Sequence, residues 1–388
     1  MDVYKKALDA HQKWGGKWQV TSKTKVDNKD DLAIAYTPGV AQPCIEIKKD
    51  KQNAYKYTLK NNLVAVVSDG SAVLGLGNIG GLAGLPVMEG KCILFKEFGG
   101  VDAIPLVLDT QNSDEIVDTI KNVAISFGGI NLEDISAPRC FEIEQKLKQI
   151  LDIPVFHDDQ HGTAIVVLAG VINSLKLVGK KIDQAKFVVN GMGAAGTSIA
   201  KLLLEYGVKH MTCCDKDGIL NDDNATLCHH KELVSLTGSH NKKGTLSDAL
   251  AGADVFVGVS VANCVTPDMV SSMAKDAVIF AMANPSPEIL PDIAKQAGAK
   301  VVGSGRSDFA NQINNVLAFP GVFRGALDAK ATQITQQMKL SAAQAIASLV
   351  GDDELNENYV IPSPFDKRVA PAVAKAVSDM AKKQGVVR

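Results

Sequence analysis

FVVNGMGAAGTSIAKLLLEYG, residues 187–207, joins a short apolar run to a glycine-rich turn and then to a helical pattern. Its glycines Gly191, Gly193 and Gly196 have the spacing G-x-G-x-x-G. Where such a turn links a strand to a helix, the N-terminus of the helix faces a dinucleotide pyrophosphate. The alternative is that these glycines serve only a tight turn and close packing. We interpret the stretch as the nucleotide-binding turn of a Rossmann-type unit, and call residues 191–196 the late glycine run.

An early glycine run with the same spacing, Gly75, Gly77 and Gly80, follows another apolar stretch. Residues 81–90 contain three glycines and a proline, and these breakers predict that no long regular helix forms there. The residues after the late run instead place apolar side chains on one helical face and charged ones on the other. We therefore expect the late run to bind the cofactor. The early run would let the backbone approach a ligand or another segment closely.

Asp215 ends the next apolar run, about 20 residues beyond the late glycine run, where a carboxylate binds ribose hydroxyls. Its charge favours NAD over NADP, because a 2′-phosphate would be repelled. The residues predicted to bind the cofactor from this pattern are Gly191, Met192, Gly193, Ala194, Ala195, Gly196 and Asp215.

Beyond residue 186, short apolar runs alternate with helical patterns. Such alternation predicts a parallel sheet covered by helices on both faces. Thr266 and Pro267 have the composition of a helix cap and first turn. The predicted strands lie at 186–191, 210–215, 254–260, 277–285 and 300–305, and the predicted helices at 196–207, 266–275 and 288–298.

The first half of the chain has a less regular rhythm. We expect a helix over about the first 20 residues and a second one capped by Ser113. A strand or turn and then a helix are predicted over 130–151, and a strand, a loop and a long apolar helix over 152–180. Further strands are predicted at 61–70, 91–100 and 104–110.

The 388 residues allow two domains, and the predicted fold class is α/β. We expect a C-terminal Rossmann-type doubly wound parallel sheet at 161–388 and an N-terminal α/β catalytic domain at 1–160. The helix that follows His-Asp-Asp-Gln at 157–160 would join the two parts.

Composition limits the partners. A net charge of −2 and a pI near 6.4 give no support for nucleic acid or an anionic membrane surface as a partner. Seven cysteines without a C-x-x-C pair predict reduced thiols in a cytoplasmic protein. We expect neither a secretory signal nor a membrane span, since no apolar stretch reaches about 18 residues.

Two pairs of adjacent acids, Glu133 with Asp134 and Asp158 with Asp159, follow apolar runs. Ligands of α/β folds collect at the carboxyl ends of strands. Carboxylates gathered inside a protein need a compensating cation, and an all-oxygen set favours Mg²⁺ or Mn²⁺ over zinc. Solvated loop acids and helix caps are the alternative. His157 and His161 have the spacing of a zinc pair, but they straddle a predicted loop, so we expect structural roles for them.

Lys91 and Tyr36 are candidate proton-transfer groups. Lys91 lies where the chain is predicted to enter an apolar strand, and a partly buried lysine near a cation can have a lowered pKa and act as a general base. Tyr36 stands beside a Pro-Gly turn, where a phenol can donate a proton. A solvated surface charge and a packed ring are the ordinary alternatives for these two side chains.

Taken together, several segments resemble the malic enzyme family, in particular its shorter bacterial branch. They occur in order from about residue 33 to 368, which is more specific than either glycine run. The segments are AYTPGVA, SDGSAVLGLGNIG, PVMEGK, INLEDISAPRCFEIE, PVFHDDQHGTA, VVNGMGAAG, AMANPSPEI, GRSDFANQINNVLAFPGVFRGALD and VIPSPFDKR.

The resemblance implies oxidative decarboxylation of L-malate to pyruvate and CO₂, with reduction of NAD or NADP and dependence on Mg²⁺ or Mn²⁺. It also implies a homodimer or a larger assembly. In this resemblance Tyr36 is the general acid and Lys91 the general base, with Lys96 as second choice. The implied metal ligands are Glu133, Asp134 and Asp159, with Asp158 as their hydrogen-bonding neighbour, and the implied malate or cofactor contacts are Asn284, Asn314 and Asn315.

One departure concerns the substrate. Larger malic enzymes carry an arginine before L-G-L-G that grips a malate carboxylate, whereas this chain has Ser71 and Ala72. Ser71, nearby backbone N–H groups or a residue of a neighbouring subunit could replace it. The early glycine run would then wall the substrate pocket.

Three other functions remain open from the sequence. A malolactic-type enzyme would release lactate without net reduction of the cofactor. A non-catalytic NAD-binding protein would not need the acids and Lys91. A plain 2-hydroxy acid dehydrogenase would not need the metal-binding carboxylates, so its activity would persist in the presence of a chelator.

Overall fold

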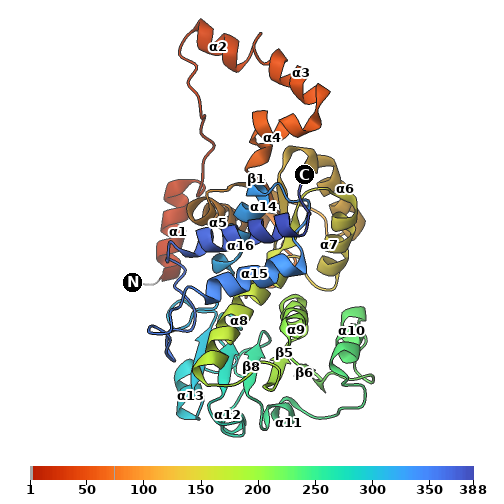
Figure 1. The fold of residues 1–388 in the computed structure, drawn as a ribbon, viewed down its shortest axis with the longest axis vertical. Helices are drawn as coiled ribbons and strands as arrows, with labels where there is room; N and C mark the ends of the chain where they lie inside the picture. Colours follow the sequence, from red (N-terminus) through yellow and green to blue (C-terminus); the bar gives the residue numbers. More distant parts are fainter. Residues whose placement is uncertain (1–2, 74) are drawn as a thin grey trace.

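The structure, a computed structural model, describes residues 3–73 and 75–388; Met1, Asp2 and Leu74 lie outside the described residues. Two sheets, one in each half of the view, organise the molecule (Figure 1). The predicted α/β class is confirmed. Across the described residues, none of the helices has the length and apolar character needed to span a bilayer.

The first sheet has four parallel strands in the order β2-β1-β3-β4. Alternate residues of β1 face opposite ways: Val64 and Val66 join the core that contains α5, whereas Ala65 and Val67 join the core under α6 and α7. The elements are β1 Leu63–Ser68, β2 Asp102–Val107, β3 Gly129–Leu132, β4 Val155–His157, α5 Gly81–Gly99, α6 Ser113–Val123 and α7 Arg139–Ile150.

The second sheet has the order β10-β9-β8-β5-β6-β7, parallel except for β7. Its odd and even residues again enter two separate cores, which is the doubly wound arrangement that the sequence predicts. The strands are β5 Lys186–Asn190, β6 His210–Asp215, β7 Gly218–Ile219, β8 Val255–Gly258, β9 Val278–Ala281 and β10 Val301–Ser304. The helices are α9 Ala194–Tyr206, α10 Cys228–Thr237, α11 Leu246–Leu250, α12 Pro267–Ser271 and α13 Pro291–Gln296.

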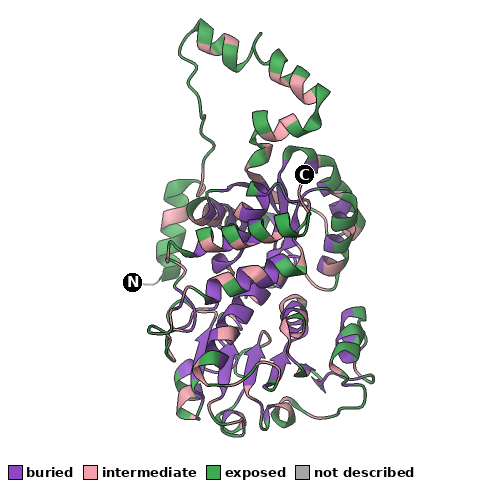
Figure 2. Cartoon of the chain, viewed as in Figure 1, coloured by how far each residue is buried: buried purple, intermediate pink, exposed green. Residues whose placement is uncertain are grey.

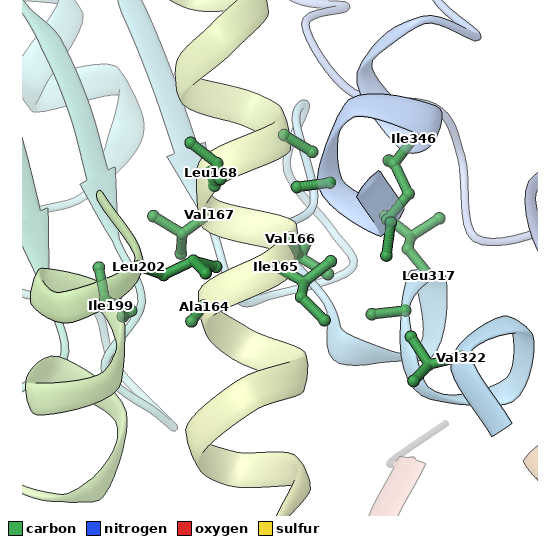
Figure 3. Packing of buried hydrophobic residues seen from close by; sticks show 14 of the residues in the cluster. Ala164, Ile165, Val166, Val167, Leu168, Ile199, Leu202, Leu317, Val322 and Ile346 are labelled. Carbon is green, nitrogen blue, oxygen red and sulfur yellow. The ribbon is translucent and has the colours of Figure 1, made fainter. Parts of the chain in front are cut away.

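A central helix, α8 (Asp158–Leu177), connects the two sheets. Figure 3 shows its segment Ala164–Leu168 between Ile199 and Leu202 of α9 on one side and Leu317, Val322 and Ile346 on the other. The C-terminal helices α14 (Phe319–Asp328), α15 (Gln336–Ala347) and α16 (Val369–Lys383) pack together, and α14 reaches α5. The predicted boundary near residue 160 falls in the first turn of α8 and stays a prediction.

Helix α5 corrects two expectations. The strand predicted at 91–100 and the absence of a long helix after the early glycine run are both wrong, because a helix covers Gly81–Gly99. Pro86 costs about 3 kcal/mol and an interior glycine about 1 kcal/mol, but each buried side chain such as Met88 or Phe95 returns about 1.5–3 kcal/mol. Gly81 is itself required, since a Cβ there would lie 2.6 Å from the Leu108 carbonyl oxygen.

Smaller differences concern helix ends. Asn112, not Ser113, caps α6, and its side chain accepts hydrogen bonds from the backbone N–H groups of Asp114 and Glu115. No loop separates β4 from α8, because the helix begins at Asp158. Thr266 caps α12 as predicted, with its side chain accepting from Met269 N. The short elements β7, α10 and α11 were not predicted.

The N-terminal region, as far as the structure describes it, contributes no fully buried residue to the cores, although Trp18 packs against the core that contains α5. Helix α1 (Val3–Trp14) is followed by an arm, residues 20–53, that carries α2 (Lys29–Ala35) and α3 (Ala41–Lys49). Figure 1 shows the arm projecting from the body before α4 (Ala54–Tyr57) returns to it, and Figure 2 shows it without buried residues. The arm nevertheless exposes apolar side chains, namely Val20, Val26, Leu32, Ile34, Tyr36, Val40 and Ile45.

Candidate active site

The predicted acids meet at the carboxyl end of the first sheet. Strands β3 and β4 are parallel, with Leu132 opposite His157, so the residues that follow them emerge side by side. Glu133 and Asp134 follow β3, and Asp158 and Asp159 form the first turn of α8. Glu133, Asp134 and Asp158 are at most 4% exposed, which excludes solvated loop acids as their description.

Three of these acids form a compact group of oxygens, which we call the acidic cluster: Glu133, Asp134 and Asp159. One carboxylate oxygen from each lies within 4.8 Å of the others. Asp134 has a positive φ of 54°, a conformation of limited stability for a non-glycine residue, and its backbone N–H donates to Asp159 Oδ2 at 2.9 Å. Asp134 Oδ2 is buried and has no hydrogen-bond partner among the described residues. Such an oxygen fits a cation ligand.

The pKa shifts of the acids also indicate a cation site. Burial, followed by the charge of Asp159, raises the pKa of Asp134 to about 8. Burial also holds the pKa of Glu133 well above its usual value, although Lys91 opposes this. Four carboxylates thus surround a single lysine, so the group lacks positive charge. A divalent cation would supply it, and an oxygen-only ligand set suits Mg²⁺ or Mn²⁺.

Lys91 lies at the centre of this site rather than on a strand. It projects from α5, is 7% exposed, and its Nζ lies 2.6 Å from Asp158 Oδ2 and 2.8 Å from Glu133 Oε1. The Phe319 ring lies beneath it, with its centroid 4.2 Å from Nζ. Burial would lower the pKa of Lys91, but the charges of Asp158 and Glu133 outweigh it and raise the pKa above the usual value. The expected lowering therefore does not occur in the chain alone.

Asn315 joins this group, because its Nδ2 donates to Asp158 Oδ2 at 2.5 Å. The side chain of Asn314 is used differently: its Oδ1 accepts from Val316 N and caps a short 3₁₀ turn, η4 (Asn315–Leu317). Burial raises the pKa of Asp158 to about 6 against the opposing charge of Lys91. Lys96, the second choice for the base, is excluded by position, since it is exposed and paired with Asp102 at 2.7 Å.

The early glycine run lies between the two halves of the molecule. A Cβ on Gly75 would lie 3.6 Å from Pro285 Cδ, so this loop touches the Asn284–Pro285 turn that follows β9. Asn284 Nδ2 donates to Met282 O at 3.2 Å. Ser71 is buried, and its hydroxyl donates to Asp69 Oδ1 at 2.6 Å while accepting from Ser136 N. The Ser71 hydroxyl therefore already donates one hydrogen bond and accepts another within the protein.

The late glycine run has the geometry of a nucleotide-binding turn. The presence of a following helix does not distinguish the two runs, since α5 follows the early one. Position does, because Gly191 directly follows β5, whereas Gly75 comes several residues after Ser68. A Cβ on Gly196 would lie 1.9 Å from Gly191 O, and Gly191 has a φ of 100°. No atom of the described residues lies within 4 Å of a Cβ on Gly193, so the turn leaves space there.

Helix α9 begins at Ala194, and in the part of the chain that the structure describes its N-terminus has no side-chain cap. Its first N–H groups therefore remain available for an anion. The carbonyl of Met192, at the turn, lies 3.2 Å from Nε2 of both His229 and His230. Asp215 ends β6 as predicted, with Oδ2 3.8 Å from His230 Nε2.

Comparison with known proteins decides the family. The model of the malic enzyme N-terminal domain matches residues 15–148, and that of the malic enzyme NAD binding domain matches residues 160–382. The chain belongs to the malic enzyme family. A bifunctional malic/malolactic enzyme of Bacillus subtilis is 57% identical over 100% of this chain and 95% of its own length. An NAD-dependent malic enzyme of Geobacillus stearothermophilus is 55% identical over 96% of this chain and 78% of its own.

Solved malic enzymes share the fold. The crystal structure of malic enzyme from Pyrococcus horikoshii matches with a TM-score of 0.95 and 48% identity, covering 100% of this chain and 92% of that one. The family and the fold class predicted from the sequence are thus confirmed. The roles of single residues remain predictions.

Three residues assigned through the malic enzyme resemblance do not join the group around Lys91: Tyr36, Asn284 and Asn314. Tyr36 directly follows α2 on the arm, as its C-cap, and is 67% exposed, whereas Lys91 is buried in the body. Within one chain, the structure brings together Lys91, Asp158, Asn315 and the acidic cluster, but not Tyr36.

Two contributors were missed from the sequence. Arg139 donates to Asp69 Oδ2 at 2.8 Å and to Ser136 Oγ at 3.1 Å, so it fixes the loops beside Asp134. Glu144 is buried on α7, and one of its oxygens lies 3.2 Å from His157 N and 2.8 Å from His161 Nε2. A charged residue on an otherwise apolar helical face was the available signal for Glu144. Arg139 offered no such signal, because its partner Asp69 is distant in sequence.

Proposed function

We propose that this protein oxidatively decarboxylates L-malate to pyruvate and CO₂ with reduction of NAD(P), and that it requires a divalent cation. One observation carries the proposal: a buried lysine in contact with two carboxylates stands beside three converging carboxylate oxygens, at the carboxyl end of a parallel sheet. The activity that the sequence predicts agrees with the malic enzyme family assignment. The cation requirement is inferred from the acidic cluster.

Glu133, Asp134 and Asp159 would hold the cation, and Mg²⁺ or Mn²⁺ suits their oxygens. When bound, such a cation supplies positive charge that stabilises negative oxygens of the substrate. Its charge would also compete with Lys91 for Glu133, which would lower the pKa of Lys91 toward that of a base. Asp158 and Asn315 would keep the lysine in place while this occurs.

The chain's own groups account for the proton transfers. Lys91 accepts the hydroxyl proton of malate as hydride leaves C2 for the nicotinamide. The C3–C4 bond of the resulting β-keto acid then breaks, CO₂ leaves, and the electron pair remains on an enolate. Tyr36 donates a proton to C3, which yields pyruvate, and Lys91 can restore the phenol proton.

The late glycine run would hold the dinucleotide. The uncapped N-terminus of α9 supports pyrophosphate binding, and Asp215 supports ribose binding. We propose NAD as the preferred cofactor, with NADP as the alternative. Asn284 follows β9 and lies beside the early glycine run, since its carbonyl oxygen would be 3.8 Å from a Cβ on Gly75, which suits a contact with malate or with the cofactor.

We also propose a homodimer in which the arm of one subunit brings Tyr36 to the Lys91 site of its partner. Exposed apolar residues of the arm, such as Leu32, Ile34 and Val40, support this assembly. Because Ser71 is committed to Asp69, the second malate carboxylate would be held by backbone N–H groups of the turn after it or by the partner subunit. The free thiols and the composition are compatible with the cytoplasmic location predicted from the sequence.

A malolactic reaction is the second candidate, and one observation favours it: the Bacillus subtilis relative is named as bifunctional. The test uses purified protein with L-malate and Mn²⁺, with NAD⁺ or NADP⁺ in separate assays, and measures reduced cofactor, pyruvate and lactate. Pyruvate equal to reduced cofactor, both lost with a chelator, supports the proposal. Lactate without reduced cofactor supports the malolactic reaction. If neither pyruvate nor lactate forms, both candidate reactions are refuted.

A further inference from the structure

A small cavity lies outside the proposed active site, where α8, α9 and α15 meet. Its volume is about 40 Å³, and its polar lining consists of His161, Ser198, Lys201, Gln336 and Lys339. Lys201 and Gln336 are partly or fully exposed at its rim, while Lys339 is only 5% exposed. The lining is therefore cationic and reaches from solvent to a buried ammonium group.

Lys339 has an incomplete set of partners. Its Nζ lies 3.0 Å from His161 Nδ1, and the neutral ring then directs its Nε2–H to Glu144 Oε1 at 2.8 Å. Within residues 3–73 and 75–388, the Nζ of Lys339 makes no other hydrogen bond, and no carboxylate lies within ion-pair distance of it. Since an ammonium group has three donors, two of them lack a partner there.

The surrounding charges leave Lys339 uncompensated. Glu144 already accepts from His161 and is paired with Lys148 at 2.8 Å, and Lys201 is paired with Glu232 at 2.7 Å. Burial, followed by the charge of Lys148, lowers the pKa of Lys339 to about 7; Glu144 opposes this shift and Lys201 adds to it. A buried lysine that faces a cavity and further cations is an arrangement that an anion would stabilise.

We propose that this cavity binds a small oxyanion, with Lys339 and Lys201 as its charged donors and Gln336 as a neutral donor at the rim. The size of the cavity limits the bound group to a few heavy atoms. Charge-assisted hydrogen bonds from two lysines favour a phosphate or carboxylate group over a neutral ligand.

The location links the proposed anion site to both halves of the molecule. His161 lies one turn after the start of α8, which carries Asp158 and Asp159. Ser198, on α9, donates to Gln160 Oε1 at 3.3 Å. An anion bound here would therefore connect α15 to α8, which carries Asp159 of the acidic cluster, and to α9, which follows the late glycine run.

The test measures binding of inorganic phosphate by titration calorimetry at about pH 6.5, without divalent metal and with saturating NAD⁺, so that the turn before α9 is filled. The variants are Lys339→Met and Lys201→Met, and the matched control is Lys209→Met, an exposed lysine. One saturable site is expected for the wild type, with about ten-fold weaker binding in each of the two variants and no change in the control.

Absence of saturable binding to the wild type, or equal affinity in the wild type and Lys201→Met, would overturn the proposal. Lys201 is 31% exposed and its substitution leaves the core intact, so this variant decides the question even if Lys339→Met does not fold. Because no malate turnover is measured, the result is independent of the proposed function.

Discussion

At the scale of residues, the site depends on a charge imbalance. Lys91 lies close to Glu133, Asp134, Asp158 and Asp159, and all of these acids but Asp159 are buried. The sequence could identify these side chains through strand ends and family segments. It could not give the helix that carries Lys91 or the contact with Phe319, because both depend on packing between segments more than 200 residues apart.

Substitution of Lys91 tests the assigned base. Lys91→Ala should lower malate oxidation by about 10²–10⁴-fold, because proton removal from the hydroxyl then lacks its acceptor, while NAD⁺ affinity measured by fluorescence should remain near the wild-type value. Lys96→Ala is the matched control and should keep wild-type turnover, since Lys96 is on the surface. Wild-type turnover by Lys91→Ala would show that another group is the base.

Substitution of Asp159 tests the acidic cluster. Asp159→Ala should weaken Mn²⁺ binding, measured calorimetrically, by more than the roughly 10–100-fold that loss of an outer-shell partner costs. Asp152→Ala, whose side chain is 85% exposed, should leave Mn²⁺ affinity unchanged. If both variants bind Mn²⁺ like the wild type, Asp159 is not a metal ligand.

At the scale of elements, the strands were predicted well and the helices less so. The five parallel strands of the second sheet are formed by apolar runs, and such runs can be recognised directly in a sequence. Helix α5 was mistaken for a strand because its glycines and proline lower local propensity, whereas the burial of Met88 and Phe95 that outweighs it is a tertiary effect. Elements such as α11, with five residues, are too short to give a periodic signal.

The late glycine run offers a matched pair of substitutions. Gly196→Ala should lower the melting temperature and NAD⁺ affinity together, because its Cβ would collide with Gly191 O. Gly193→Ala has open space in the protein alone, so it should keep the melting temperature and weaken NAD⁺ binding only. Thermal unfolding and fluorescence titration measure the two effects. Equal behaviour of the two variants would contradict the nucleotide-turn assignment.

Helix α15 offers a prediction about pH. The folded pKa of Lys339, about 7, is lower than the roughly 10.4 of an unfolded lysine, so between these values the unfolded chain binds more protons. The free energy of unfolding therefore gains a contribution that rises with pH from about 7 to about 10.4. Lys339→Met should remove this rise relative to the wild type in urea unfolding at several pH values. An unchanged slope would mean that Lys339 keeps an ordinary pKa.

At the scale of the whole molecule, the body is compact but the arm is not packed against it. No described residue before Val64 is buried, yet the arm carries Tyr36 and several exposed apolar side chains. The sequence pattern around Tyr36 could identify the residue but not its separation from Lys91, since a pattern does not state which copy of the chain completes a site. The central claim of our account is that the complete site requires two chains.

Subunit complementation tests this claim most directly. Tyr36→Phe and Lys91→Ala are each purified, mixed in equal amounts, allowed to exchange subunits, and assayed for malate-dependent pyruvate formation. Each variant alone should have little activity, and the mixture should recover about a quarter of the wild-type rate, because half of the dimers are mixed and each holds one intact site. A mixture that exchanges subunits but is no more active than its two components would contradict a site shared between subunits.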